Sequence, residues 1–136
     1  MFSSNVPEFF RQEERSGFES FLDALPGPYL VLLDGEGAVV GCGGYALRER
    51  SGTADLCWGM VHRERQGEGL GRALTVLRLE GALQDPRVTE VALETSQHTV
   101  GFYERLGFRA TSVEPDAYAP GLDRVRMVRS AGARSE

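Results

Sequence analysis

Three glycines at alternate positions are the residues of this chain best suited to bind a phosphate group. Gly67, Gly69 and Gly71 follow an apolar run and lead into a segment with helical periodicity. The start of a helix carries unpaired backbone N–H groups and the positive end of the helix dipole, so phosphate binds there readily. Glycine lets the backbone approach a phosphate and adopts dihedral angles that other residues resist. The stretch Gln66–Gly71 therefore predicts a pyrophosphate cradle.

Two common phosphate-binding motifs do not fit this stretch. A dinucleotide-binding fold requires the pattern G-x-G-x-x-G, and Arg72 stands at the position of its third glycine. An ATP-binding P-loop ends in Gly-Lys followed by Ser or Thr, whereas Arg72 and Ala73 follow Gly71 here. A glycine-rich turn without a ligand remains as the alternative.

The elements around the cradle are expected to form a mixed α/β (α+β) domain with a strand–helix–strand crossover. Hydrophobic periodicity and turn residues predict their order. The expected elements are helical residues 6–24, strands at 29–34, 38–47 and 53–61, a helix from 70 to 85, a strand at 88–95, a helix at 98–107, and strands at 108–113 and 124–130. Residues 114–123 are expected to form a connecting loop.

The helix after the cradle is predicted to be amphipathic. Its apolar stripe is expected at Leu70, Ala73, Leu74, Leu77 and Gly81, with Arg72, Arg78 and Glu80 outside the stripe. Pro86 ends this helix, and Gly107 is a good C-terminal glycine for the next one.

Length and composition bound the kind of protein. The 136 residues suit a single domain, expected at residues 1–130 with a flexible tail at 131–136. A formal net charge of −5 without a basic stripe argues against a nucleic-acid partner and fits cationic partners such as amines. No apolar stretch is long enough to span a membrane and no signal peptide is evident, so we expect a cytoplasmic protein. Cys42 and Cys57 are expected to be free thiols, and a metal site is not expected.

The residues of the cradle resemble a motif of the GNAT superfamily of N-acetyltransferases. Gln66–Gly71 is similar to its acyl-CoA pyrophosphate motif, which has Gln or Arg first, Gly fourth and Gly or Ala sixth. Gly101–Phe108 resembles a second hallmark, a helix that bears a tyrosine and ends in Leu-Gly-Phe. The resemblance extends over about residues 28–128. It implies the GNAT acyl-CoA N-acyltransferase fold, in which helices flank a mixed central sheet that is splayed at its middle.

The resemblance implies acetyl-CoA as co-substrate and no metal. The strand before the cradle would pair with the pantetheine arm through its backbone, and the backbone N–H groups of the cradle would hold the pyrophosphate. Ser96 stands where family members often carry Asn on the pantetheine side. The residues expected to bind the donor are Met60, Val61, His62, Gln66, Gly67, Glu68, Gly69, Leu70, Gly71, Arg72, Ser96 and Tyr103.

The resemblance also implies the catalytic residues. Tyr103 matches the tyrosine near the thioester sulfur and would protonate the leaving thiolate as a general acid. A lysine-like amine is protonated at pH 7, so a base must take its proton, directly or through a water. Asp55 and Glu94 are the two candidates for this base. The walls of the acceptor site are expected to come from Phe9, Phe10, Tyr45, Trp58 and the loop around Tyr118.

The function implied is transfer of an acetyl group from acetyl-CoA to a primary amine of a small molecule or peptide, directly in a ternary complex. A non-catalytic acyl-CoA-binding sensor or regulatory module is the alternative. The family usually opens with a strand before its first helix, for which residues 1–5 leave little room. That strand is missing, shortened or supplied by another subunit, and the open sheet edge would favour a homodimer.

Overall fold

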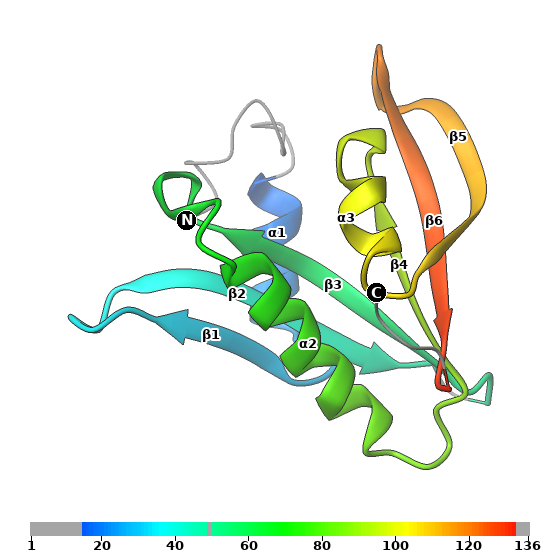
Figure 1. Cartoon of the computed structure of the whole chain (residues 1–136), viewed down its shortest axis with the longest axis horizontal. Coiled ribbons are helices and arrows are strands. Elements are labelled where there is room, and N and C mark those ends of the chain that lie inside the picture. The colour runs from blue at the N-terminus through cyan, green and yellow to red at the C-terminus, as the bar shows by residue number, and fades with distance from the viewer. Residues whose placement is uncertain (1–14, 49, 133–136) are drawn as a thin grey trace. The chain divides into compact units, whose positions relative to one another are not determined.

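The computed structural model describes residues 15–48 and 50–132 (Figure 1). Its elements are α1 (Arg15–Asp23), β1 (Tyr29–Leu33), β2 (Val39–Leu47), β3 (Thr53–Val61), η3 (Arg63–Arg65), α2 (Leu70–Leu83), β4 (Glu90–Thr95), η4 (Gln97–Thr99), α3 (Val100–Glu104), β5 (Arg109–Ala119) and β6 (Leu122–Ser130), where η marks a 3₁₀ helix. The strands hydrogen-bond in the order β1-β2-β3-β4-β6-β5. The sheet is mixed, because β3 and β4 pair in parallel while β6 is antiparallel to both β4 and β5. The predicted fold class is confirmed.

The described chain forms two compact units. The first contains residues 15–46 and 56–81, and the second contains residues 47–55 and 82–132 apart from residue 49. Strand β3 contributes to both, since its first three residues pair with β4 in the second unit.

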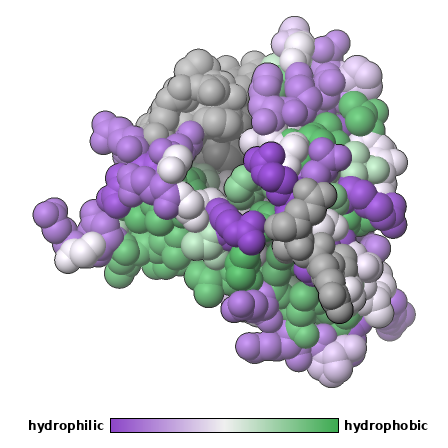
Figure 2. All heavy atoms as spheres, in the orientation of Figure 1, coloured by the Kyte–Doolittle hydropathy of each residue, from purple (hydrophilic) through white to green (hydrophobic). Residues whose placement is uncertain are grey.

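The β1–β2 hairpin of the first unit turns where the sequence predicts. The carboxylate of Asp34 accepts the backbone N–H groups of Glu36 at 2.9 Å and Ala38 at 3.0 Å. The N–H groups of Ala38 and Glu36 hold the pKa of Asp34 below its usual range. Gly37 closes the turn with a φ of +84°. Strand β1 is one end of the sheet, and the hairpin exposes Val31, Leu33 and Val39. Figure 2 shows hydrophobic residues gathered in the region of β1 and β2.

Helices α1 and α2 cover opposite faces of this hairpin and β3 (Figure 1). Phe18 of α1 packs in a cluster with Cys42 and Met60. Gly43, the next residue of β2, faces the guanidinium of Arg78 in α2, because successive residues of a strand point to opposite faces.

The buried face of α2 differs from the predicted apolar stripe. Leu74 is buried as predicted, but Leu77 is 44% exposed, whereas Arg78, expected outside the stripe, is only 3% exposed. A Cβ atom built on Gly59 would lie 2.6 Å from Nη2 of Arg78, and one built on Gly43 would lie 3.1 Å from its Cζ. Because these two strand residues lack side chains, the guanidinium fits where a hydrophobic side chain was expected.

The second unit is built around the pairing of β4, β6 and β5. Leu93 of β4 lies opposite Met127 of β6, and both are buried. Leu106, which follows α3, is also buried, and its carbonyl oxygen accepts the Nε–H of the buried Arg129 at 2.9 Å. The unit therefore encloses a small core of its own, in which the guanidinium of Arg129 caps the end of the α3 segment.

The predicted loop at residues 114–123 is instead a long hairpin, and the loop prediction is wrong. Strands β5 and β6 continue to Ala119 and from Leu122. Asp116 has a φ of +56°, and the register shifts between Glu114 and Ala119. Because β5 is the edge strand of the sheet, it tolerates this irregularity and the prolines that suggested a loop.

Several expectations concern residues near the ends of the chain. Phe9, Phe10, the possible strand before α1 and residues 133–136 of the tail lie outside the described residues. Division into one domain and a tail therefore stays a prediction, as does the homodimer. Cys42 and Cys57 form no disulfide bond, as expected. Within residues 15–48 and 50–132, no helix combines the length and apolarity needed to cross a membrane.

Replacing Gly27 with alanine is expected to destabilise the first unit. A Cβ atom built on Gly27 would clash with the carbonyl oxygen of Tyr45 and lie 3.2 Å from Cα of Ala46. Because both atoms belong to the backbone, the strand would have to shift, which should lower the free energy of unfolding by about 1–3 kcal/mol. Urea unfolding should show this loss for Gly27→Ala and none for Gly35→Ala, where an added Cβ meets no atom within 4 Å. Equal stabilities would contradict this packing.

Candidate active site

The predicted cradle forms an open turn at the start of α2. Gly67 and Gly69 have φ values of +88° and +80°, in the left-handed region that favours glycine. A Cβ atom built on either residue would meet no other atom within 4 Å. The glycines are therefore required by the backbone conformation, and the space beside them is open. Helix α2 begins immediately afterwards at Leu70.

Side chains of the first unit brace this turn. Arg65 donates to both carboxylate oxygens of Glu68, at 2.8 and 3.0 Å, and reaches Asp34 of the β1–β2 turn at 3.4 Å. The Arg65 guanidinium holds the pKa of Glu68 below its usual range. Gln66 donates through Nε2 to the carbonyl oxygen of Val61 at 3.3 Å. Glu68 and Gln66, both expected at the donor site, thus hold the turn in place.

The end of β3 departs from a regular strand. Trp58 has a φ of +45°, which is rare for a bulky residue. The backbone N–H of His62 donates a hydrogen bond to the carbonyl oxygen of Val40 in β2 at 2.8 Å. Because successive residues of a strand present their backbone groups to opposite sides, Val61 faces away from β2. On that side the carbonyl oxygen of Val61 accepts the hydrogen bond from Nε2 of Gln66, at 3.3 Å.

Arg72 lies in the first turn of α2 with an exposed side chain. It makes no hydrogen bond or ion pair with another residue in the described part of the chain. A cation at this position is next to the start of the helix, where an anion would bind, and is available to meet that anion.

Tyr103 lies on α3 in the second unit and is partly buried. Its ring packs edge-on against Phe102 and Phe108, with ring centroids 5.0 and 5.7 Å away. Its phenol has no hydrogen-bond partner among the described residues. Gly107 ends the segment with a φ of +93°, so the backbone N–H of Phe108 can donate to the carbonyl oxygen of Tyr103 at 3.1 Å. This tight ending fixes the ring of Tyr103 against Phe108.

Ser96 begins the short η4 helix that leads into α3. Its hydroxyl oxygen accepts the backbone N–H of His98 at 3.4 Å and caps this turn. The structure thus gives Ser96 a local role in positioning the segment that carries Tyr103.

Asp55 is held by an arginine that the sequence reading missed. Arg48 donates through Nε and Nη2 to the two carboxylate oxygens, at 2.5 and 2.8 Å. This pairing raises the pKa of Arg48 above its usual value. The backbone N–H of Arg48 donates to the carbonyl oxygen of Thr53 at 2.9 Å. The turn between β2 and β3 thereby positions Arg48 beside Asp55.

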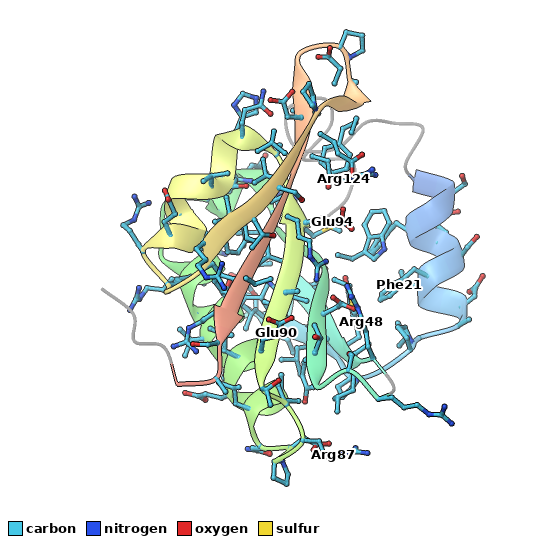
Figure 3. All side chains as sticks on the ribbon, turned by 90° about the vertical axis from the view of Figure 1, so that its right-hand side faces the viewer. Phe21, Arg48, Arg87, Glu90, Glu94 and Arg124 are labelled. Carbon is cyan, nitrogen blue, oxygen red and sulfur yellow. The ribbon has the colours of Figure 1, made fainter. Side chains whose placement is uncertain are left out.

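Glu94 is held more loosely, by Arg124 of β6. Its Oε2 lies 3.2 Å from Nε of Arg124, which makes no hydrogen bond, and the Glu94 side chain is 52% exposed. Arg124 also donates to Glu114 at 2.5 Å. The side chains of Arg124, Glu94 and Arg48 follow one another down the view in Figure 3.

The two candidate bases share one face of the second unit. Asp55 lies opposite Ala92 in the parallel register, and Glu94 is two residues further along β4. Because residues two apart on a strand point to the same face, the two carboxylates lie on one side of the sheet. Glu90 and Glu94, four positions apart on β4 and therefore on one face, were the sequence signal for this face.

The predicted donor and catalytic residues fall into two groups. Met60, Val61, His62 and Gln66–Arg72 belong to the first unit, whereas Asp55, Glu94, Ser96 and Tyr103 belong to the second. Their assembly into one donor and catalytic site stays a prediction.

The aromatic residues proposed as acceptor walls lie in different places. The hydroxyl of Tyr45 would lie 2.5 Å from a Cβ built on Gly81 in α2. Trp58 packs against Phe18 of α1, with ring centroids 5.2 Å apart. Tyr118 is a partly buried residue of β5. Their role in binding an acceptor stays a prediction.

Comparisons with known proteins agree on one family. The family model described as an acetyltransferase (GNAT) domain matches residues 5–131. A protein from Desulfovibrio desulfuricans that is assigned to the acetyltransferases of the GNAT family has a similar structure, with a TM-score of 0.79 and 27% identity over 96% of this chain and 88% of that one. A search of curated proteins finds no match to the sequence.

Two more distant structures share the fold. An IAA acetyltransferase from Bacillus cereus has a TM-score of 0.74 and 19% identity, over 88% of this chain and 86% of that one. An aminoglycoside 6'-N-acetyltransferase complexed with coenzyme A has a TM-score of 0.74 and 16% identity, over 97% of this chain and 87% of that one.

Replacing Gly69 with alanine is expected to destabilise the turn before α2. Its φ of +80° would force an alanine into the left-handed region, at a cost of about 1–2 kcal/mol in the free energy of unfolding. Chemical unfolding of Gly69→Ala should show this loss, whereas Gly101→Ala, which places an alanine inside helix α3, should not be less stable. An unchanged stability of Gly69→Ala would show that the turn does not need its left-handed conformation.

Proposed function

Because the chain belongs to the acetyltransferase (GNAT) family, we propose that it transfers the acetyl group of acetyl-CoA to a primary amine in a ternary complex. The observation that carries this proposal is the open, left-handed glycine turn at the start of α2. The amine belongs to a small molecule or a peptide, and we propose that the protein acts in the cytoplasm.

The turn at residues 66–71 fits a pyrophosphate group. Gly67 and Gly69 leave open space beside a backbone that leads into the N-terminus of a helix, and Arg72 adds a cation that has no partner among the described residues. The complex of coenzyme A with one structural neighbour supports the assignment of this ligand. Acetyl-CoA would supply an acetyl group on a thioester, while the residues of this chain hold and orient it.

Tyr103 is proposed as the general acid. Its phenol has no hydrogen-bond partner among the described residues, so its proton is not committed to another group of the protein. The packing of its ring between Phe102 and Phe108 fixes the position of Oη. From there Oη would deliver its proton to the departing thiolate.

Glu94 is proposed as the base in preference to Asp55. Both oxygens of Asp55 accept hydrogen bonds from Arg48, and its side chain is 32% exposed. Glu94 uses one oxygen in a looser ion pair and is 52% exposed. A carboxylate with a free oxygen can accept a proton from the amine or from a water without first breaking a bidentate pair.

Calorimetric titration with acetyl-CoA tests the proposed function. We expect saturable binding of acetyl-CoA and of CoA, and no binding heat with ATP. Release of free CoA in the presence of amines would then establish transfer. Tight binding without turnover of any amine would favour a non-catalytic acyl-CoA sensor, and no binding at millimolar ligand would overturn the proposal.

Tyr103→Phe is expected to lower kcat by about 100-fold or more, since general acid catalysis contributes this much. The affinity for acetyl-CoA, measured by calorimetry, should stay within about twofold because the ring and its packing remain. Phe102→Leu serves as a packing control, because it changes the same ring cluster without removing a proton donor. A kcat of Tyr103→Phe equal to that of the control would exclude Tyr103 as the acid.

Matched amide substitutions test which of the two carboxylates acts as the base. Glu94→Gln should lower kcat by about 100-fold and Asp55→Asn by much less, because only Glu94 has an oxygen outside its ion pair. The reverse ranking of the two variants would assign the base to Asp55.

A further inference from the structure

A cavity in the second unit is lined by arginine side chains. Its volume is about 490 Å³, and its lining residues are Leu47, Arg48, Arg50, Gly52 and Arg87. Pockets for small molecules have volumes of roughly 300–1,000 Å³. These described lining residues contribute three guanidinium groups and no carboxylate, although the chain has a formal net charge of −5. The cavity therefore gathers three guanidinium groups, two of which also pair with the carboxylates of Asp55 and Asp85.

The backbone of Gly52 brings these arginines together. Its carbonyl oxygen accepts the backbone N–H groups of Thr89 at 2.7 Å and Glu90 at 3.3 Å. The turn that carries Arg48 and Arg50 is thereby joined to the start of β4, which follows Arg87. A Cβ atom built on Gly52 would lie 2.8 Å from Oγ1 of Thr89, and its φ is +73°, so glycine is required at this junction.

The three guanidinium groups differ in how they are paired. Arg87 binds Asp85, at 2.7 Å between Nη2 and Oδ2. Arg50 has no ion-pair partner in the part of the chain that the structure describes. Arg48 binds Asp55 through Nε and Nη2, and its Nη1 makes no hydrogen bond to a described residue. Arg87 likewise uses Nε, at 3.1 Å, and Nη2 in its pair with Asp85, and its Nη1 makes no hydrogen bond to a described residue. Arg50 and the Nη1 edges of Arg48 and Arg87 can therefore donate to an anion in the cavity.

Arg48 joins this cavity to the face that carries the candidate bases. One edge of its guanidinium binds Asp55, and the residue also lines the cavity. Glu94 is close enough to Arg48 to contribute to raising its pKa, after Asp55. In Figure 3 the side chains of Glu94, Arg48 and Arg87 follow one another down the view. A ligand anchored in the cavity would thus extend from the arginines toward the two carboxylates.

We propose that this cavity binds the anionic group of the acceptor, so that the preferred acceptor is a primary amine that also carries a carboxylate or phosphate group. This inference rests on the proposed acetyltransferase function. Guanidinium groups would hold the oxyanion, while the amine reaches toward Asp55 and Glu94. Acceptors with only positive charges would find no partner in these guanidinium groups, would be repelled by Arg50 and would bind less well.

Binding of inorganic phosphate tests the cavity without requiring turnover. The titration is done by calorimetry in saturating CoA, so that the turn at residues 66–71 is blocked. Saturable millimolar binding is expected, with a loss of at least about tenfold in affinity in the double variant Arg50→Gln/Arg87→Gln. The control Arg109→Gln removes an exposed arginine of β5 and should bind like the wild type. Equal binding by all three proteins would overturn the assignment.

Matched pairs of acceptors test the substrate class. Phosphoethanolamine is compared with ethanolamine, and 6-aminohexanoate with hexylamine. The wild type should favour the anionic member of at least one pair by about tenfold or more in kcat/KM, mainly through KM. The ratio should fall toward one in Arg50→Gln/Arg87→Gln, recover in part in Arg50→Lys/Arg87→Lys, and stay unchanged in Arg109→Gln. Equal turnover of both members, or an unchanged ratio in the double glutamine variant, would overturn the proposal.

Free phosphate distinguishes an acceptor site from a regulatory one. It should compete with the anionic acceptor and leave the neutral amine unaffected. Activation of the neutral amine without competition would show an effector site and contradict the proposal. Failure of acetyl-CoA to bind would instead remove the proposed function, while the phosphate titration would still decide whether the cavity binds an anion.

Discussion

Helix α2 rests on β2 and β3 through a buried arginine, and the two glycines beneath that arginine decide how closely the helix can lie. Arg78 is 3% exposed and its Nε has no hydrogen-bond partner among the described residues. Burial of a charge without such partners is costly. Any side chain at Gly59 would overlap the guanidinium. Gly43 and Gly59 therefore fix the distance between α2 and the strands, and with it the position of the cradle at the start of α2.

The cradle is further defined by contacts that reach across the first unit. Arg65 links Glu68 of the turn to Asp34, which itself organises the β1–β2 hairpin. The glycines provide a conformation that side chains resist, and Arg65 selects that conformation from the many that glycines allow. The glycines of this turn permit many backbone conformations, and the contacts of Arg65 hold one of them. A turn that is already held in one conformation loses less entropy when it binds a ligand.

Local signals were sufficient for most elements and for the conformation of the glycine turn at residues 66–71. Positive φ at Gly67, Gly69 and Gly107 and the start of α2 depend on residue types close in sequence, and these predictions are confirmed. Burial of Arg78 depends on glycines in two other strands, so helical periodicity alone gave the wrong face for this residue. The hairpin at residues 114–123 contains turn-forming residues, and only its place at the sheet edge explains why they form strands.

The ion pairs of the carboxylates could also not be predicted from the sequence. Glu94 pairs with Arg124, for example, and these two residues lie on strands that are distant in the chain. The consequence is chemical. An acidic face that is already paired with arginines is less attractive to a polyvalent cation than the net charge of −5 suggests. Arg48 binds Asp55 by one edge and leaves the other toward a cavity where Arg50 has no described partner. These ion pairs and the unpaired edge of Arg48 are the observations behind the proposal of an acceptor that carries both an amine and an anion, whereas composition alone suggested a cationic partner.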